Sequence, residues 1–224
     1  MEMEACPDNC ATLALRVYGE LKRRLNSGLL KPGAFIDQSA LGEELGMSRA
    51  PLRDALIKLE TEGFVSVLPR RGVKVRVLDL PTIRDVYEII GALESATARS
   101  FQPSDKDLVN MKTLMAGMDE TLGRDDFDAY YAANVAFHEA YLSVSTNTEL
   151  RKQVTLLKER LYDFPRKRGF LKAWEVASMA EHREILARFE GGDSSGAADW
   201  IRDVHWSYRV QEPFIREYYP EAAG

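Results

Sequence analysis

The sequence has few cysteines and no long apolar run. Its two cysteines, Cys6 and Cys10, lie at the start of the chain, and nothing near them could complete a four-ligand zinc site. We therefore assign them no metal or redox role and expect them to remain thiols in a cytoplasmic protein. No apolar run approaches the roughly 18 residues that span a membrane. The sequence thus predicts a protein with no membrane partner.

The first ten residues, MEMEACPDNC, have neither a basic start nor an apolar stretch. They therefore do not resemble a secretion signal, and we expect residues 1–10 to form a flexible arm. The chain has 224 residues, of which 45% are hydrophobic, and this length suits two domains with real cores. Histidine is also scarce, with three in the whole chain.

The formal net charge of -5 argues against a nucleic-acid partner until it is divided along the chain. Residues 11–78 hold 12 Lys and Arg and 7 Asp and Glu, a net charge of +5. Residues 79–224 hold 18 and 25, a net charge of -7. A basic module of this kind suits phosphate binding that is set by its local field and weakened by salt. For the acidic part, a merely solvated charged face remains an alternative.

The stretch LGEELGMSRAPLRDALIKLE (residues 41–60) has the pattern of two short helices that meet at a glycine. Gly46 can turn the chain between them. The expected inner faces are Ala40, Leu41 and Leu45 in the first helix and Leu52, Ala55, Leu56 and Leu59 in the second. Ser48 stands at an N-cap position and Pro51 in the first turn, while Arg49, Arg53 and Lys58 point outward. This pattern predicts a helix-turn-helix whose second helix fits the major groove.

The segments around this pair complete a winged helix. Residues 64–78 (FVSVLPRRGVKVRVL) alternate like two strands around a Pro-Arg-Arg-Gly turn, which predicts a wing. Leu13, Val17, Leu21 and Leu25 recur every four residues and predict a third helix that buries the other two. We therefore expect residues 11–78 to form a winged helix-turn-helix domain.

These residues resemble the N-terminal domain of GntR-type transcription regulators. The resemblance rests on the G-x-L-x-P-G segment at residues 28–33, the L-G-x-S-R-x-P-x-R-x-A-L run after it, and the E-G-F-V and R-R-G parts of the wing. It implies that Arg49 and Arg53 contact bases or adjacent phosphates and that Ser48 contacts a phosphate. It also implies that Arg71 and Gly72 reach the minor groove at the wing tip.

Beyond residue 78 the apolar spacing is helical throughout. Breaks at proline, glycine and polar clusters divide it into six helices, at 82–100, 104–122, 126–144, 147–164, 171–190 and 194–217. Six or seven helices joined by short loops predict an antiparallel bundle at residues 79–224, whose core can hold a ligand or a metal. The fold class is thus mostly α, a winged helix followed by an all-helical domain.

All three histidines lie in this second part, each within an expected helix. Asn134 and His138 are four residues apart and share one helical face, while His182 and His205 belong to two later helices. Imidazole is a common ligand of divalent transition metals, so the four groups could converge on one ion. The alternative is that each histidine is a separate core or surface residue, which is the usual role of a lone histidine.

Residues 81–218 resemble the FCD effector domain of FadR-subfamily GntR regulators, many of which bind a metal. The family pattern is an acidic residue or Asn four before the His of x-x-F-H, then E-H-x-x-I, then a His on the last helix. The matching residues here are Asn134, Phe137 with His138, Glu181 with His182, and His205. The resemblance therefore implies a metal site formed by Asn134, His138, His182 and His205, for which Zn, Ni and Mn are all admissible.

The chain departs from the family at two positions. Many relatives have Asp where this chain has Asn134, and the amide removes one negative charge, which favours an effector that brings its own carboxylate. Relatives also often have Arg where Ile90 stands in YEIIGALE, so the effector class is less firmly implied.

The residues and the resemblance together predict a homodimeric regulator, and not an enzyme, that binds a pseudo-palindromic DNA operator and responds to a small organic acid. Repression relieved by the effector is expected from the family alone. The alternatives are a zinc hydrolase, which needs a general base near the metal, and an architectural DNA binder without an effector. Glu139 and Glu181 neighbour ligands in sequence, but we expect them to point elsewhere because adjacent helical residues diverge by about 100°.

Overall fold

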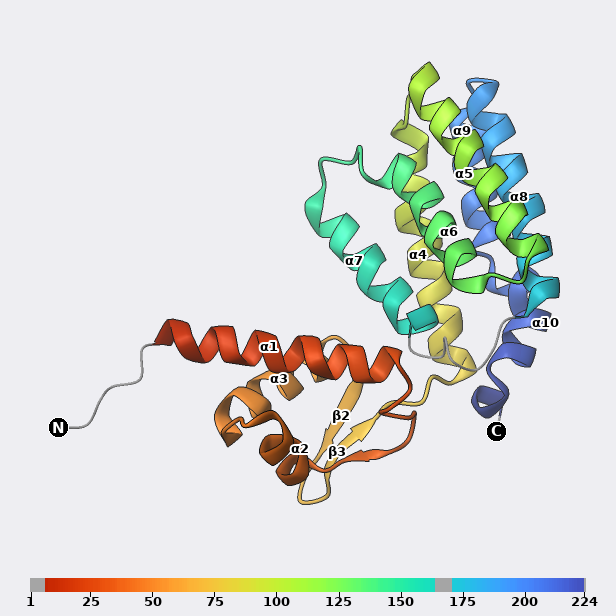
Figure 1. Ribbon diagram of the computed structural model, residues 1–224. Helices are drawn as coiled ribbons and strands as arrows, with labels where there is room; N and C mark the ends of the chain where they lie inside the picture. Colours follow the sequence, from red (N-terminus) through yellow and green to blue (C-terminus); the bar gives the residue numbers. More distant parts are fainter. Residues whose placement is uncertain (1–6, 164–170, 224) are drawn as a thin grey trace. The chain divides into compact units, whose positions relative to one another are not determined.

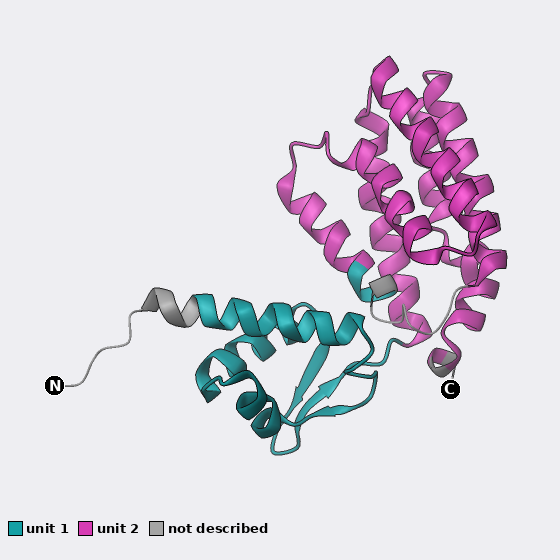
Figure 2. Ribbon diagram, viewed as in Figure 1, with its two compact units in different colours: residues 1–78, 159–168 teal, residues 79–158, 169–224 magenta. Residues whose placement is uncertain are grey.

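The computed structural model describes residues 7–163 and 171–223. The chain forms two compact units, coloured teal and magenta in Figure 2. The first contains residues 1–78 and 159–168, and the second contains residues 79–158 and 169–224. The first unit therefore takes in a short segment from far along the chain, which its sequence pattern did not indicate. The peptide bond between Lys158 and Glu159 is one of the points where the chain passes between units.

The first unit is a three-helix winged helix (Figure 1), which confirms the predicted fold. Its antiparallel sheet has the strand order β1-β3-β2. The elements are α1 (Pro7–Asn26), β1 (Phe35–Ile36), α2 (Gln38–Leu45), α3 (Arg49–Thr61), β2 (Val65–Leu68) and β3 (Gly72–Val75). Strand β1 was not predicted because a two-residue strand carries no alternation.

The start of α1 corrects the expectation for the N-terminus. The helix begins at Pro7, so residues 7–10 of the predicted arm are helical, while residues 1–6 lie outside the described part. Proline is well tolerated at the first position of a helix because its missing N–H has no partner there anyway. Cys10 thus lies in α1. Further along, Val17, Leu21 and Leu25 are fully buried, as their spacing predicted.

The helix-turn-helix forms as predicted, but two residues on the expected inner face of its first helix differ: Leu45 is half-buried and Ala40 is not buried. Asp37 caps α2 by accepting hydrogen bonds from the N–H groups of Ser39 and Ala40 at 3.0 Å, and Gly46 ends the helix in the left-handed region at φ 61°. In α3 the apolar face predicted from the sequence is buried. Ala40, however, is exposed. It belongs to the first turn that Asp37 caps, where the side chain faces solvent.

The described part of the second unit contains helices and loops and no strand, as predicted. Its α-helices are α4 (Leu80–Ser100), α5 (Asp105–Gly123), α6 (Phe127–Leu142), α7 (Thr148–Lys158), α8 (Lys172–Glu190), α9 (Ser194–Trp200) and α10 (Tyr208–Tyr218). Polar side chains fix their starts: Asp79 caps α4, and Ser104 with Asp107 forms a capping box at α5. Figure 1 shows α4, α5, α6, α8 and α9 running side by side as a bundle.

Two π-helical segments, η1 (Glu159–Asp163) and η3 (Ile201–His205), interrupt this regular pattern, and a 3₁₀ turn η4 (Pro220–Ala223) ends the described chain. The single helix predicted at 194–217 is therefore wrong, because η3 and the break at Trp206 divide it into α9 and α10. The apolar spacing across 194–217 stays nearly helical, so periodicity alone could not reveal one widened turn.

Gly91 allows η3 to lie directly against α4. A methyl group built at Gly91 would be 3.0 Å from Trp206 Cβ and 3.6 Å from the backbone of Arg202. The first distance is shorter than ordinary van der Waals contact, and the second neighbour is main chain that cannot rotate away. The glycine in YEIIGALE therefore positions the segment that carries His205.

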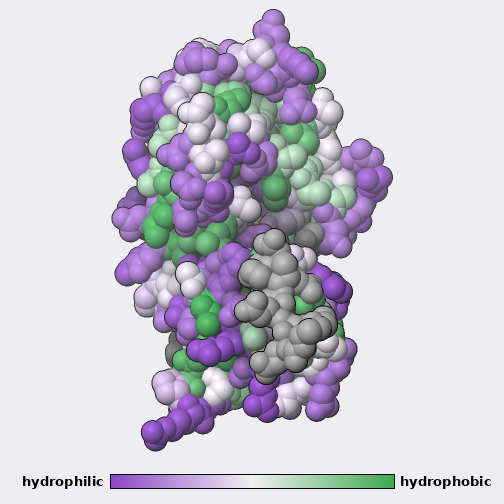
Figure 3. Space-filling view, turned by 90° about the vertical axis from the view of Figure 1, so that its left-hand side faces the viewer, coloured by the Kyte–Doolittle hydropathy of each residue, from purple (hydrophilic) through white to green (hydrophobic). Residues whose placement is uncertain are grey.

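No helix among residues 7–163 and 171–223 is long and apolar enough to cross a membrane. On the face shown in Figure 3, polar residues predominate and apolar residues form patches between them.

We expect Gly91→Ala to lower the free energy of unfolding by about 1–3 kcal/mol, the usual cost of forcing a methyl group into a packed core. Gly117→Ala in α5 is the matched control, since nothing lies within 4 Å of its added methyl group. That control should stabilise the protein by about 0.4–1 kcal/mol through the helix preference of alanine. Urea unfolding measures both, and equal effects would show that Gly91 is not needed for close packing.

Candidate metal centre and nucleic-acid interface

The three histidines come together in the second unit. His138 on α6, His182 on α8 and His205 at the end of η3 have possible ligand atoms within 4.8 Å of one another. The Nε2 atoms of His138 and His182 are 3.1 Å apart, and the ring centroids of the three residues are 4.8–5.1 Å apart. His138 and His182 are buried, and the side chain of His205 is 9% exposed. Three helical segments thus place three imidazoles around one point.

Glu94 of α4 fixes the orientation of His138. Its Oε2 atom lies 2.8 Å from His138 Nδ1 and accepts a hydrogen bond from the Tyr141 hydroxyl. A carboxylate only accepts hydrogen bonds, so His138 Nδ1 carries the proton. The Nε2 lone pair is then left facing the other histidines. Glu94 is fully buried and also forms an ion pair through Oε1 with Lys158 at the end of α7.

His205 is oriented in the same way by Glu181. Its Nδ1 lies 2.7 Å from Glu181 Oε2, while Glu181 Oε1 accepts from Gln211 Nε2 at 2.8 Å. Gln211 in turn accepts from the Trp174 indole N–H at 2.9 Å. The expectation that Glu181 points away from the site is therefore wrong in part. Its carboxylate faces Nδ1 of His205, which we call the outer nitrogen, because η3 brings that nitrogen to α8.

This donor set fits a divalent transition metal. Carboxylates on the outer nitrogens of His138 and His205 leave the inner nitrogens as lone-pair donors, the arrangement that tunes metal-binding histidines in proteins. His182 Nδ1 is buried and makes no hydrogen bond within the described residues. If occupied, the site would use these three imidazoles as its nitrogen ligands.

Burial keeps His138 and His182 neutral. It lowers the pKa of His138 to about 4, with the Lys158 ammonium adding to the effect, and holds the pKa of His182 well below its usual range. Burial opposes ionisation of Glu94, but Lys158 and His138 outweigh it, so the pKa of this carboxyl lies well below its usual value. At neutral pH His138 and His182 are therefore unprotonated, and Glu94 is ionised.

Asn134 lies one helical turn before His138 on α6 and is partly buried. It adjoins the buried hydroxyl of Tyr130, where Glu175 and Ser178 are also found. Burial raises the pKa of Glu175 to about 7. Asn134 thus shares the helical face of His138, but its part in a metal site stays a prediction. Ile90, the second position at which the sequence differs from the family pattern, is fully buried in α4.

The sequence pattern did not predict four further residues around the histidines, which are Glu94, Tyr141, Lys158 and Gln211. Glu94 had a detectable signal, because it follows Ile83, Tyr87 and Ile90 on the apolar face of α4. A carboxylate in such a stripe must have a buried partner. The other three are ordinary helical residues whose role depends on tertiary contacts.

The first unit presents the predicted DNA-contacting residues on its surface. Ser48, Arg49 and Arg53 are exposed, and Ser48 makes no capping hydrogen bond with its side chain although its backbone is at the N-cap position. Among the described residues neither arginine forms an ion pair, whereas Lys58 pairs with Glu62 at 2.7 Å. The N-terminal turn of α3 therefore carries two uncommitted guanidinium groups and a free hydroxyl.

The wing tip is the tight turn between β2 and β3. Leu68 pairs with Gly72, and the Arg71 N–H donates to the Leu68 carbonyl at 3.0 Å. Gly72 has φ 98° and Arg70 has φ 60°, so the turn depends on left-handed backbone. Arg71 is exposed there, as predicted for a residue that reaches DNA. The roles of these residues in binding stay predictions.

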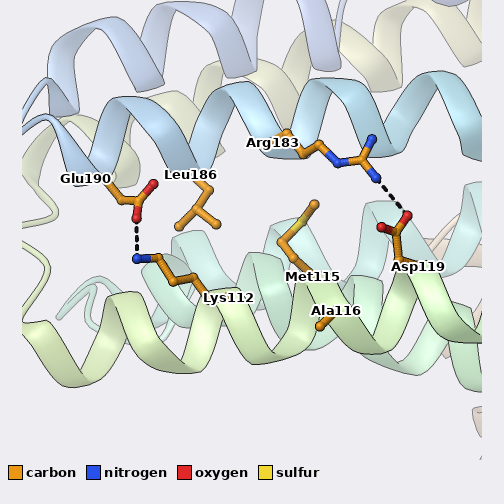
Figure 4. Close-up of a pocket in the computed structure, with 7 residues that line it drawn as sticks. All are labelled: Lys112, Met115, Ala116, Asp119, Arg183, Leu186 and Glu190. Carbon is orange, nitrogen blue, oxygen red and sulfur yellow. Dashed lines mark hydrogen bonds and ion pairs between the residues drawn. The ribbon is translucent and has the colours of Figure 1, made fainter.

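A separate groove of about 310 Å³ lies on the outside of α5 and α8 (Figure 4). Lys112 pairs with Glu190 and Arg183 with Asp119, so each ion pair joins the two helices, and Met115 and Leu186 lie between them. None of the three histidines lines this groove. We assign it a role in joining the helices only.

Comparisons with known proteins match both units. Residues 13–75 match the model for bacterial regulatory proteins of the gntR family, and residues 85–204 match the model for the FCD domain.

Individual relatives agree with these matches. The chain is similar to the Nta operon transcriptional regulator of Aminobacter aminovorans, with 32% identity over 58% of this chain and 63% of that relative. It is similar to the regulator McbR of Escherichia coli, with 27% identity over 86% and 89% of the two chains. The gluconate operon transcriptional repressor of Bacillus subtilis is 28% identical over 59% and 55%.

Solved structures share the fold. That of Escherichia coli McbR/YncC has a TM-score of 0.66 at 23% identity, and the match covers 93% of this chain and 98% of that one. A Rhodococcus GntR structure has a TM-score of 0.67 at 19% identity, covering 94% and 97%.

The lowered pKa of His138 predicts a pH dependence of stability. The folded protein keeps this side chain neutral down to about pH 4, whereas the unfolded chain protonates it near pH 6.5. Acid therefore favours the unfolded state between these two pH values. By pH 5 the free energy of unfolding should have fallen by about 2 kcal/mol.

Urea unfolding at pH 7 and pH 5, with a chelator present, measures this loss. His138→Gln is the control and should lose less stability across the same interval. Identical pH dependence in the two proteins would show that His138 is not held neutral.

Proposed function

Because the chain belongs to the gntR family of bacterial regulatory proteins and carries an FCD domain, we propose that it is a regulator whose operator binding is controlled by a small carboxylate. Its family consists of DNA-binding transcription regulators, and the chain is one of these and not an enzyme. The observation that carries the effector proposal is the cluster of His138, His182 and His205 with carboxylates on two of the outer nitrogens.

The histidine cluster supports a metal-dependent effector site. Zn, Ni and Mn all accept imidazole ligands, and a divalent ion on three neutral histidines keeps open positions and a positive charge. Asn134 would add a neutral amide oxygen and leave that charge uncompensated. An effector carboxylate supplies the missing negative charge, so a small organic acid is the ligand class that the site favours.

The DNA-binding mode follows from the exposed surface of α3. One winged helix contacts too few base pairs for specificity, so we propose a homodimer that binds a pseudo-palindromic operator. An effector that prefers one arrangement of the helical domains changes the geometry of the two DNA-binding units and shifts operator affinity. A related protein carries the name repressor, which favours repression relieved by the effector.

The arrangement of Glu181 argues against a zinc hydrolase. A hydrolase needs a general base that can reach a metal-bound water. Glu181 instead accepts hydrogen bonds from the outer nitrogen of His205 and from Gln211, so both its oxygens are engaged in orienting the histidine.

Arg49→Ala and Arg53→Ala should each weaken operator binding by about 1–3 kcal/mol if the side chain binds a base edge. A residue that binds phosphate should give a value near the low end and a smaller salt dependence. Fluorescence anisotropy over a range of salt concentrations measures both. Circular dichroism and sedimentation should show unchanged helix content and an intact dimer. If neither variant alters the dissociation constant, α3 is not the recognition helix.

His182→Gln should weaken metal binding by about a hundredfold or more, since even the loss of an outer hydrogen-bond partner costs about 10–100-fold. Glutamine keeps most of the side-chain volume. The melting temperature of the variant should therefore be lower than that of the wild type when metal is present and about equal to it when a chelator is present. Asn134→Asp should tighten metal binding, because it restores a negative charge.

Elemental analysis and thermal melting of the same preparations test this pair. Wild-type protein that takes up no stoichiometric metal under any reconstitution would end the proposal. Equal destabilisation of His182→Gln with and without chelator would assign the histidines a purely structural role.

A further inference from the structure

Lys158, the last residue of α7, places a cation beside the histidine cluster. Its side chain is 14% exposed, and its ammonium pairs with the buried Glu94. The same ammonium lies 5.4 Å from the centre of the Trp206 ring, which is itself 5.4 Å from the ring of His205 and 6.2 Å from that of His138. Lys158 therefore contacts Glu94, which holds His138, and lies near Trp206, which adjoins His138 and His205.

The formal charges around the cluster sum to a positive value that an anion can compensate. A divalent ion and Lys158 together contribute +3, while Glu94 and Glu181 contribute -2. Glu175, near Tyr130, is partly protonated at neutral pH because burial raises its pKa to about 7, so it does not fully cancel the remaining charge.

The ion pair with Glu94 leaves Lys158 with further hydrogen-bond donors. An ammonium has three N–H donors, and Lys158 forms its ion pair with Glu94 at Oε1. The other oxygen of Glu94 is held independently by His138 and Tyr141. Lys158 can therefore donate to a ligand without leaving Glu94 unpartnered, and its side chain is not completely buried.

We propose that Lys158 is the residue that selects an anionic effector, by donating a hydrogen bond to a carboxylate that also occupies an open position of the metal at His138, His182 and His205. This assignment rests on the proposed metal site and adds the protein group that distinguishes an acid from a neutral molecule. A charge-assisted hydrogen bond of this kind corresponds to about a 10–100-fold gain in affinity.

Cobalt-loaded protein provides a direct test, because the visible spectrum of Co²⁺ changes when an anion enters its coordination sphere. Acetate is the probe, and acetamide, which has the same shape without the charge, is its neutral counterpart. Acetate should alter the spectrum of the wild type and acetamide should not. Lys158→Met should bind acetate about 10–100-fold more weakly while still taking up Co²⁺. Lys152→Met, an exposed position on the same helix, should behave as the wild type.

Lys158→Met leaves Glu94 with one partner fewer, which can destabilise the fold and also lowers the charge of the site. The double variant Lys158→Met/Glu94→Gln removes both charges and restores the net charge of the wild type. It should still bind acetate weakly if Lys158 contacts the anion. Recovery of wild-type affinity in the double variant would show that only net charge matters and would overturn the proposal.

The remaining outcomes separate this proposal from the one on which it rests. Failure of the wild type to bind Co²⁺ would refute the metal site and Lys158's role with it. Co²⁺ uptake with no acetate response in the wild type, or with equal acetate affinity in Lys158→Met, would refute the role of Lys158 alone. Loss of Co²⁺ from Lys158→Met would show that the lysine supports the metal site and not the anion.

Discussion

The second unit depends on how one fully buried carboxylate, that of Glu94, is neutralised. A charge without water must have partners, and removing one partner of a buried pair typically costs about 3–5 kcal/mol. Here His138, Tyr141 and Lys158 supply those partners from α6 and α7. The same contacts orient an imidazole and hold a cation next to it. The requirement to compensate Glu94 therefore also shapes the candidate site.

Irregular backbone completes this arrangement. The π-helical turn η3 ends at His205, and η1 begins directly after Lys158. A widened turn changes the direction of the side chains that follow it, which is why such turns are frequent at functional sites. Gly91 makes the first of them possible by letting η3 approach α4. The second π-helical turn, η1, begins with Glu159, which belongs to the first unit. Its carboxylate accepts a hydrogen bond there from the Lys22 ammonium at 2.8 Å. Lys158, the residue before Glu159, belongs to the second unit.

The two units differ in how their positively charged side chains are paired. The basic unit keeps Arg49 and Arg53 free of ion pairs within the described residues, whereas most arginines and lysines of the helical unit are paired on its surface. Surface pairs of that kind add little stability. They do, however, remove exposed positive charge from the acidic unit, so the attraction for phosphate is concentrated on the winged helix.

The sequence alone determined the winged helix, the helical bundle and the identity of the three histidines, because these depend on local periodicity, capping residues and turn glycines. It also assigned the exposed side of α3, since that side is the complement of a buried stripe. Only the tertiary structure decided how the site is built. Glu94, Glu181 and Lys158 come from three different helices, and no spacing along the chain records that they meet. The split of the last helix was likewise invisible, because one extra residue in a turn hardly changes the apolar period but redirects His205 and Trp206.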